Sequence, residues 1–446
     1  MEEINTELTF SDTQVETLGP AKIDSPILRE DNVDPEHDFT SDNDRILVNI
    51  NPETIEKFRA KGEQPASFEL AGPRRKIYFD TSKVRCALVT CGGLCPGLND
   101  IIRAIVLELY YRYGVRNIYG IRYGLEGFIP EYGHEVIDLV PKTVVNILNT
   151  GGTMLGSSRG PQDIEKIVDS LERMNISILF MIGGDGTLMA ATKISDEITN
   201  RGLKISVIGI PKTIDNDIYL ISRSFGFDTA VDIATAAIKS AHSEAEGYPN
   251  GVGLIKLMGR HSGFIAATAA LARQDVNFVL VPEIDFDLDG AEGLLSDLEK
   301  RLKTRGHAVI VVAEGAGQKF FQEEEKLLDA SGNVRLKDIG LFLRDLINQH
   351  FSAKGIDIAL KYIDPSYIIR SLPANANDSV FCGFLGRDAV HAAIAGKTKI
   401  LVGHWNNHFV HLPMKLSVGR RKQINPHGKL WRTVLEATGQ GNFKNG

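Results

Sequence analysis

The sequence predicts an α/β fold with largely parallel sheets, preceded by an N-terminal extension. From Val84 onward, short apolar runs of strand length alternate with amphipathic stretches of helix length. This alternation is typical of βαβ units, in which helices cover both faces of a parallel sheet. No repeat with a period of roughly 20 to 50 residues is apparent, which excludes a solenoid.

The predicted elements form strand–helix pairs along the chain. They are a strand at 84–90 with a helix at 101–114, then 176–182 with 188–200, 205–210 with 228–245, 251–258 with 264–272, 277–283 with 292–306, and 307–317 with 338–351. Ligands of such sheets bind beyond the carboxyl ends of the strands. A functional site is therefore expected at the junctions between strand and helix.

The N-terminal part has a different composition. Up to Arg45 the chain carries thirteen Asp or Glu against three Lys or Arg, with few aromatic residues. Such a segment cannot bury enough apolar surface to offset the entropy lost on ordering. We therefore expect residues 1–44 to form a mobile acidic tail and residues 45–83 to pack on the body as an extension.

Composition and charge exclude several classes of protein. With 446 residues, 43% hydrophobic and 24% charged, the chain is typical of a globular protein of about two or three domains. A net charge of −7 offers no field that attracts nucleic acid, and no apolar run approaches the ~20 residues of a membrane helix. The acidic N-terminus resembles neither a secretory signal nor a transit peptide. We therefore expect a cytoplasmic protein whose cysteines, Cys86, Cys91, Cys95 and Cys382, are buried thiols.

The first distinctive junction is CGGLCPGLND, residues 91–100, which places three glycines and a proline between a predicted strand and a helix. Glycine lets backbone N–H groups approach a phosphate, and a helix N-terminus adds positive potential. A structural tight turn is an equally good interpretation of this segment by itself. The segment is neither a Walker loop nor a GxGxxG fingerprint.

The second junction is GGDGT, residues 183–187, directly after the apolar run ILFMI. An aspartate between glycines at a strand end suits Mg²⁺ held beside phosphates, because Mg²⁺ binds oxygen ligands and keeps few protein ones. The alternative is an aspartate that caps the following helix. The same motif occurs in NAD kinases and diacylglycerol kinases, so it indicates a phosphoryl-donor site more firmly than a particular acceptor.

The third junction is PKTIDND, residues 211–217, after the apolar run ISVIGI. If Asp185 holds Mg²⁺ and a phosphoryl donor, Asp215 could accept the proton of an attacking hydroxyl, while Asp217 supports it or the metal. Lys212 would then neutralise charge on the transferring group. A solvated turn is the simpler alternative for this segment.

With these motifs, and with MGRHSGFIA at 258–266, VVAEGAG at 311–317 and YIIRS at 367–371, the chain resembles the 6-phosphofructokinase family over most of its length. The resemblance implies two Rossmann-like three-layer α/β/α lobes. They are a nucleotide-binding lobe at 84–220, completed by part of the C-terminal segment, and a sugar-phosphate-binding lobe at 221–400, followed by an extension at 401–446. It also implies that a homodimer or homotetramer transfers the γ-phosphoryl group of MgATP to the 1-hydroxyl of fructose 6-phosphate.

The resemblance assigns roles residue by residue. The implied catalytic residues are Asp215 as general base, Asp217, Lys212 and Arg260. The implied nucleotide-binding residues are Gly93, Arg159, Gly160, Gly184, Asp185, Gly186 and Thr187, with Asp185 as the magnesium ligand. The implied substrate-binding residues are Thr213, Ile214, Asp215, Met258, Gly259, Arg260, Glu314, Lys361, Tyr367 and Arg370, whose guanidinium would bind the 6-phosphate.

Some positions depart from the short bacterial members of the family. Those enzymes carry an arginine, donated across a subunit interface, where this chain has Gly251, and a second arginine and a histidine where this chain has Lys361 and Tyr367. These changes match the plant, protist and pyrophosphate-using branch of the family.

Two positions point to different phosphoryl donors, because Gly186 is of the ATP-dependent type and Lys212 of the pyrophosphate-dependent type. A carboxylate at position 186 would stand where the α-phosphate of ATP lies, and two unit charges about 4 Å apart repel by roughly 4 kcal/mol at an effective dielectric near 20. A lysine excludes neither donor. We therefore predict ATP, with pyrophosphate as the alternative; a kinase acting on NAD or a lipid, or a non-catalytic sugar-phosphate sensor, is more distant.

Overall fold

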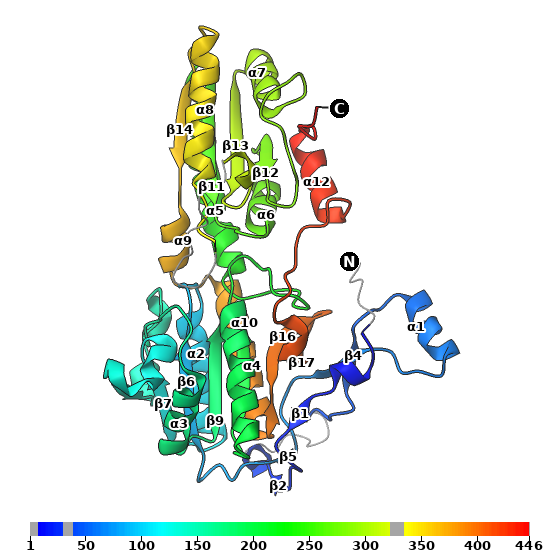
Figure 1. The fold of residues 1–446 in the computed structure, drawn as a ribbon, viewed down its shortest axis with the longest axis vertical. Coiled ribbons are helices and arrows are strands. Elements are labelled where there is room, and N and C mark those ends of the chain that lie inside the picture. The colour runs from blue at the N-terminus through cyan, green and yellow to red at the C-terminus, as the bar shows by residue number, and fades with distance from the viewer. Residues whose placement is uncertain (1–7, 30–38, 322–333, 446) are drawn as a thin grey trace.

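The structure, a computed structural model, describes residues 8–29, 39–321 and 334–445. They form two α/β lobes stacked along the long axis of the molecule, each with its own sheet covered by helices (Figure 1). The predicted fold class is therefore confirmed. The predicted strand–helix pairs are present, and their ends lie within a few residues of the expected ones.

The first lobe is built on a nine-stranded sheet. In spatial order its strands are β3 (Arg45–Leu47), β4 (Ser67–Leu70), β17 (His408–Pro413), β16 (Ile400–Trp405), β10 (Ser206–Pro211), β9 (Ile178–Gly183), β6 (Arg85–Thr90), β7 (Asn117–Ile121) and β8 (Val136–Asp138). The run from β16 to β7 is parallel, and the strands outside it are antiparallel. A purely parallel sheet thus forms the centre of the lobe.

Both faces of this sheet are buried. Along β6, Cys86 and Leu88 join one apolar core and Ala87 and Val89 join the other. The first core is covered by α2 (Leu98–Leu107) and α10 (Ala376–Ile394), and the second by α3 (Ile164–Arg173) and α4 (Asp185–Asn200). This double burial explains why the strand sequences are continuous apolar runs.

The second lobe has a four-stranded, wholly parallel sheet. Its strands are β12 (Phe278–Leu280), β13 (His307–Ala313), β11 (Gly251–Leu257) and β14 (Ala359–Ile363), in that order. Its helices are α5 (Phe227–Glu246) and α6 (Phe264–Arg273) on one face, and α7 (Leu294–Arg305) and α8 (Ile339–Ala353) on the other. The short helices α9 (Ser366–Ser371) and α11 (Met414–Ser417) lie in connections.

The chain crosses between the lobes more often than the expected boundaries imply. After the second sheet, α10 returns to pack on α2 and β10 of the first lobe, and β16 and β17 complete the first sheet. The last helix, α12 (Lys429–Thr438), then packs on α6 of the second lobe (Figure 1). Residues 376–400, expected in the second lobe, therefore belong to the first, and the expected C-terminal extension is shared by both.

The described part of the expected mobile tail differs from that expectation. The strand β1 (Glu16–Thr17) pairs with β15 (Lys397–Thr398), and β2 (Ile23–Asp24) pairs with β5 (Lys76–Ile77). Residues 1–7 and 30–38 of that tail lie outside the described residues. The expected extension contributes β3 and β4 to the first sheet and the exposed helix α1 (Pro52–Ala60).

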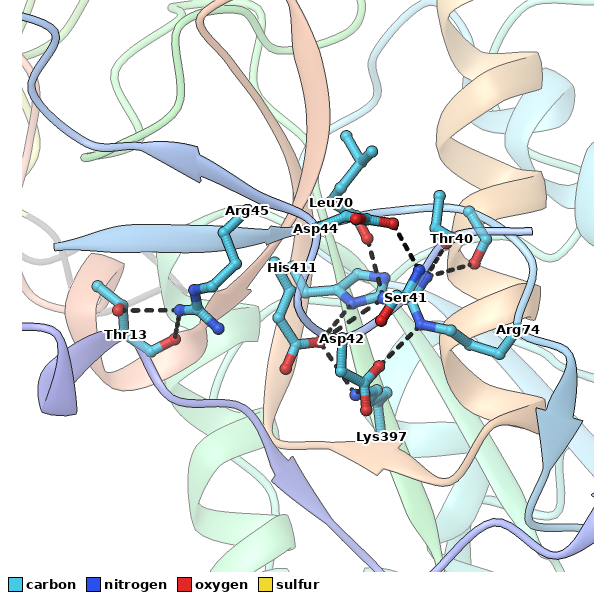
Figure 2. Close-up of polar contacts among 12 residues, drawn as sticks. Thr13, Thr40, Ser41, Asp42, Asp44, Arg45, Leu70, Arg74, Lys397 and His411 are labelled. Carbon is cyan, nitrogen blue, oxygen red and sulfur yellow. Dashed lines mark hydrogen bonds and ion pairs between the residues drawn. The ribbon is translucent and has the colours of Figure 1, made fainter. Parts of the chain in front are cut away.

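A group of charged side chains, which we call the Lys397 network, holds this N-terminal part in place (Figure 2). The network consists of Asp42, Glu69, Arg74, Lys397 and His411. Lys397 Nζ lies 2.8 Å from Asp42 Oδ1 and 3.0 Å from Glu69 Oε2. Arg74 Nε donates to Asp42 Oδ1 at 2.9 Å, and His411 Nδ1 lies 3.4 Å from Glu69 Oε2. An acidic residue of the expected tail is thus a partner of nearly buried cations.

All four cysteines are free and buried, as predicted. None of the helices in the described ranges is long and apolar enough to cross a membrane.

Candidate active site

Three of the predicted junctions meet because β6, β9 and β10 are neighbouring parallel strands. Their carboxyl ends lie on one edge of the sheet, so the loops that follow them adjoin. Pro211, at the end of β10, pairs with Gly183 of β9, and Cys91 N donates to Ile182 O at 2.9 Å. Segments more than a hundred residues apart in sequence therefore form one continuous surface.

The PKTIDND loop is held by its own side chains. Thr213 Oγ1 accepts a hydrogen bond from Asp215 N at 3.1 Å and donates one to Asp217 Oδ1 at 3.1 Å. Asn216 has a φ of 53°, a left-handed conformation that asparagine tolerates, and its Oδ1 accepts from Ser224 N at 3.0 Å. The two aspartates are therefore presented from a fixed backbone rather than from the solvated turn that was the alternative.

Asp215 is a carboxylate with an unsatisfied oxygen. Its Oδ1 is buried and has no hydrogen-bond partner among the described residues. Burial, together with the neighbouring charges of Asp217 and Glu314, raises the pKa of Asp215 to about 8. Glu314 belongs to the second lobe, so the lobes meet at this carboxylate. Once ionised, Asp215 is therefore a much stronger proton acceptor than an ordinary carboxylate, and its pKa lies close to neutral pH.

Lys212 and two arginines from distant segments surround Gly93. Lys212 Nζ donates to Gly93 O at 2.6 Å, and burial lowers the pKa of Lys212. A Cβ at Gly93 would lie 3.4 Å from Arg159 Nη2 and 3.5 Å from Arg370 Nη1. Such a group of cationic side chains is suited to binding phosphate groups. Arg370, which the resemblance places at the sugar 6-phosphate, thus lies beside the loop expected to bind the nucleotide.

Asp185 is the first residue of α4 and is connected to the C-terminal segment. Its Oδ1 accepts a hydrogen bond from Gly419 N at 3.1 Å, and its Oδ2 lies 3.8 Å from Arg421 Nη2. The same guanidinium donates to Asp217 Oδ2 at 2.8 Å. Arg421 therefore joins the aspartates of two strand ends. Sequence reasoning missed Gly419 and Arg421, because GRRKQ matches no motif; its adjacent arginines are the only signal.

The surroundings of Asp185 fit a hard cation. Its side chain is 23% exposed, and the contact to Arg421 is longer than a hydrogen bond. A Cβ placed on the following residue, Gly186, would meet no atom within 4 Å. A carboxylate beside open space matches the needs of Mg²⁺, which keeps several of its water molecules when it binds.

The second lobe contributes the MGR segment (258–260), which follows β11, and Glu314, which follows the adjacent strand β13. Gly259 has a φ of 130°, and a Cβ there would lie 2.4 Å from Ser262 O, so only glycine fits. Ser262 Oγ donates to Asp215 O at 3.2 Å, which joins this segment to the PKTIDND loop.

Near Glu314, positive charges partly offset the effect of burial on the pKa of this carboxyl group. Burial raises the pKa of Glu314, and the nearby positive charges of Arg260, Lys256 and Arg370 oppose this rise. Arg260 also donates from Nη1 to Val334 O at 3.2 Å. Arg260 and Glu314 therefore belong to the same electrostatic environment as Asp215.

The remaining predicted residues lie at the site in different ways. Thr187 is buried in the first turn of α4, Ile214 is buried in the core, and Gly160 has a φ of 96° beside Arg159. Gly184 caps α4 and lies against Lys212, whose carbonyl oxygen would be 3.3 Å from a Cβ at that glycine.

Of the predicted substrate-binding residues Lys361 and Tyr367, the first lies away from the rest and the second lies beside Arg370. Lys361 Nζ lies 5.3 Å from the centroid of the Tyr248 ring, and Tyr248 precedes β11 whereas Glu314 follows β13. Tyr367 is 78% exposed, and its ring lies 5.2 Å from the guanidinium carbon of Arg370. Within one chain, Tyr367 therefore lies close to the other predicted residues, whereas Lys361 does not.

The sequences of several known proteins match most or nearly all of this chain. An ATP-dependent 6-phosphofructokinase of Borreliella burgdorferi is 50% identical over 437 residues, covering 96% of this chain and 97% of that protein. One of Amycolatopsis methanolica is 48% identical, covering 97% and 96%. ATP-dependent 6-phosphofructokinase 1 of Arabidopsis thaliana is 49% identical, covering 84% and 80%.

Solved structures support the same fold. A pyrophosphate-dependent phosphofructokinase from Marinobacter aquaeolei aligns with a TM-score of 0.66 at 23% identity, covering 80% of this chain and 92% of that one. Pichia pastoris phosphofructokinase in the T-state aligns with a TM-score of 0.61 at 21% identity, covering 75% and 35%. The family model described as Phosphofructokinase matches residues 85–393. The chain therefore belongs to the phosphofructokinase family.

Proposed function

We infer that the protein is an ATP-dependent 6-phosphofructokinase, which transfers the γ-phosphoryl group of ATP to the 1-hydroxyl of fructose 6-phosphate and releases ADP. The relatives that carry this name are about half identical to the chain over nearly its full length. The structural observation that supports the inference most directly is Arg421, which contacts both Asp185 and Asp217. The charge of Asp217 acts on Asp215, the proposed proton acceptor, so the phosphoryl-donor site and the proton acceptor can act on one reacting group.

In this proposal, each group has a chemical task. Asp215 accepts the proton of the 1-hydroxyl as the oxygen attacks phosphorus, because its Oδ1 has no competing partner and its pKa is raised to about 8. Lys212, Arg159 and Arg370 stabilise negative charge on the phosphates. Asp185 would hold Mg²⁺, which supplies neutralising charge between the phosphates when it is bound.

The preference for ATP over pyrophosphate rests on Gly186. Among the described residues, no atom outside its chain neighbours and its own helix backbone lies within 4 Å of a Cβ at this position, so the space remains available to the donor. The variant Gly186→Asp should weaken ATP binding by about a thousandfold, from ~4 kcal/mol of charge repulsion, and should affect pyrophosphate less. Gly186→Asn, of the same shape but uncharged, is the matched control. Equal effects of the two variants would show that size, not charge, governs donor selection.

The deciding experiment is a set of parallel initial-rate measurements with fructose 6-phosphate, Mg²⁺ and either ATP or pyrophosphate. We expect turnover with ATP and dependence on Mg²⁺. Turnover with pyrophosphate and none with ATP would overturn the assignment of the donor. Binding of fructose 6-phosphate without turnover on either donor would instead favour a sugar-phosphate sensor.

We also propose a homo-oligomer located in the cytoplasm. Beside the site, Tyr367 and Ile368 are 78% and 60% exposed, and such apolar surface suits a contact between subunits. Two of the plant relatives are named chloroplastic, so location varies within the family. Light scattering after gel filtration tests the oligomer, with a monomer as the contrary outcome, and cell fractionation tests the location.

A further inference from the structure

Two histidines and a glutamate meet at the end of the second lobe that is remote from the candidate active site. We call His242, Glu246 and His307 the His242 cluster. His242 and Glu246 lie in the last turns of α5, and His307 is the first residue of β13. The strand β13 runs from this cluster to Glu314 over seven residues, which corresponds to roughly 20 Å. Within one chain, the cluster is therefore separate from the phosphoryl-transfer site.

The three side chains have the spacing of metal ligands. His242 Nε2 lies 3.5 Å from Glu246 Oε1, and the potential ligand atoms of all three residues lie within 4.8 Å of one another. The centroids of the two imidazole rings are 5.3 Å apart. Around a tetrahedral Zn²⁺, with bonds of ~2.0–2.1 Å, neighbouring ligand atoms are about 3.3 Å apart. Small side-chain rotations would bring the three atoms to that spacing.

The backbone that carries the cluster is held rigidly. His242 and Glu246 are four residues apart, so they project from the same face of α5. In the sheet His307 pairs with Gly251, where a Cβ would lie only 2.0 Å from Ala245 O. Any larger residue at Gly251 would force α5 away from β11. This close contact fixes the separation between the helix and the strand, so the ligand set is already assembled before an ion binds.

We propose that His242, Glu246 and His307 bind a first-row transition-metal dication, Zn²⁺ foremost, through two imidazole nitrogens and one carboxylate oxygen. Imidazole suits Zn²⁺, Co²⁺ and Ni²⁺, whereas Mg²⁺ selects oxygen ligands, so this site and the predicted Mg²⁺ site differ in their metal. All three ligands are half-buried or exposed, so solvent can fill the remaining coordination position. A bound ion would tie the C-terminal end of α5 to the start of β13.

The test uses Co²⁺ as a spectroscopic probe on chelator-treated full-length protein, with excess Mg²⁺ present to occupy sites that consist only of oxygen ligands. We expect one equivalent of Co²⁺ to produce visible d–d absorption, Zn²⁺ to displace it, and Zn²⁺ to raise the melting temperature. Absence of Co²⁺ uptake by the unmutated protein would overturn the proposal.

Variants locate the ion. His242→Ala and His307→Ala should each weaken Co²⁺ binding at least tenfold. Glu246→Lys should do the same, and because Glu246 is exposed this change leaves the core intact. His350→Ala is the matched control, because His350 has a carboxylate neighbour, Glu299, 3.7 Å away and belongs to no such cluster among the described residues. Unchanged absorption in the cluster variants, or its loss in His350→Ala, would place the ion elsewhere. Phosphofructokinase turnover with Mg²⁺ should be the same in all variants, which separates this proposal from the proposed function.

Discussion

The Lys397 network and the surroundings of Asp215 are both groups of largely buried charged side chains, with Asp42 as the exposed member of the network, but their carboxylates have partners to different degrees. In the network, each carboxylate faces a cation at about salt-bridge distance: Asp42 contacts Arg74 and Lys397 (Figure 2), and Glu69 contacts Lys397. At Asp215, one oxygen has no partner among the described residues, and the nearest charges that raise its pKa are other carboxylates.

This difference separates a stabilising group of charges from a reactive one. A buried carboxylate without a partner costs free energy, and such a cost persists where the group has chemistry to perform. The carboxylates of the network have no such unpartnered position, although His411 Nε2 lacks a hydrogen-bond partner among the described residues, and the network fixes the position of the N-terminal segment. We therefore expect changes at Asp215 to affect turnover and changes at Lys397 to affect stability.

The largest effect is expected from Asp215→Asn, which removes the proton acceptor while it preserves the size of the side chain. Turnover should fall by about 10²–10⁴-fold. The affinities for ATP and fructose 6-phosphate, measured by calorimetry, should remain near those of the unmutated protein. Turnover within a few-fold of normal would mean that another group accepts the proton.

The second effect is on stability. Lys397→Met removes the cation nearest to Glu69, which is only 5% exposed and lies 3.7 Å from Arg74 Nη2, so the free energy of unfolding should fall by about 3–5 kcal/mol. Lys399→Met is the matched control, because Lys399 pairs with the exposed carboxylates of Glu16 and Asp196 and should cost about 1 kcal/mol or less.

Both lysine variants should retain the normal kcat of the folded enzyme, since neither residue lies at the candidate active site. Denaturant titration measures the free energy of unfolding, and initial rates measure kcat. Equal loss of stability in the two variants would show that the burial of Lys397 does not distinguish it from Lys399.

The third effect concerns Arg421, which belongs to the reactive group although it lies far along the chain. Arg421→Gln removes a charged hydrogen bond to Asp217, worth about 1.5–3 kcal/mol. We expect kcat/KM to fall by roughly 10- to 150-fold. Arg420→Gln is the control, because the guanidinium carbon of Arg420 lies 5.5 Å from the Tyr219 ring centroid. Similar losses of kcat/KM in both variants would show that the hydrogen bond from Arg421 to Asp217 does not account for the effect.

The last effect is a change in the pH dependence of stability. Because the pKa of Asp215 rises from 3.8 to about 8 on folding, the folded state keeps a proton that the unfolded state has released between these pH values. Stability should therefore fall as pH rises through this window, by at most about 1.4 kcal/mol per pH unit from this group. Asp215→Asn should reduce this slope. Unfolding free energies at pH 5 and pH 8 measure it, and equal slopes would contradict the raised pKa.

The sequence by itself determined the fold class and most of the loops of the candidate site. The apolar runs of β6, β9 and β10 identify buried parallel strands, and parallel strands place their carboxyl ends on one edge. The loops that carry Asp185 and Asp215 could therefore be predicted to adjoin, because each loop directly follows one of these strands. Local patterning is sufficient for such residues.

Only the tertiary structure decided which distant side chains complete the site. Arg421 reaches Asp217, and Arg370 reaches Gly93, because β16 and β17 return to the first sheet and α9 lies where the lobes meet. No periodicity or spacing encodes such contacts. The same holds for Asp42. The composition of its acidic segment predicts a mobile tail, but in the fold Lys397 and Arg74 are its buried partners. Charges pair according to position in space, and position in space follows from how the whole chain packs.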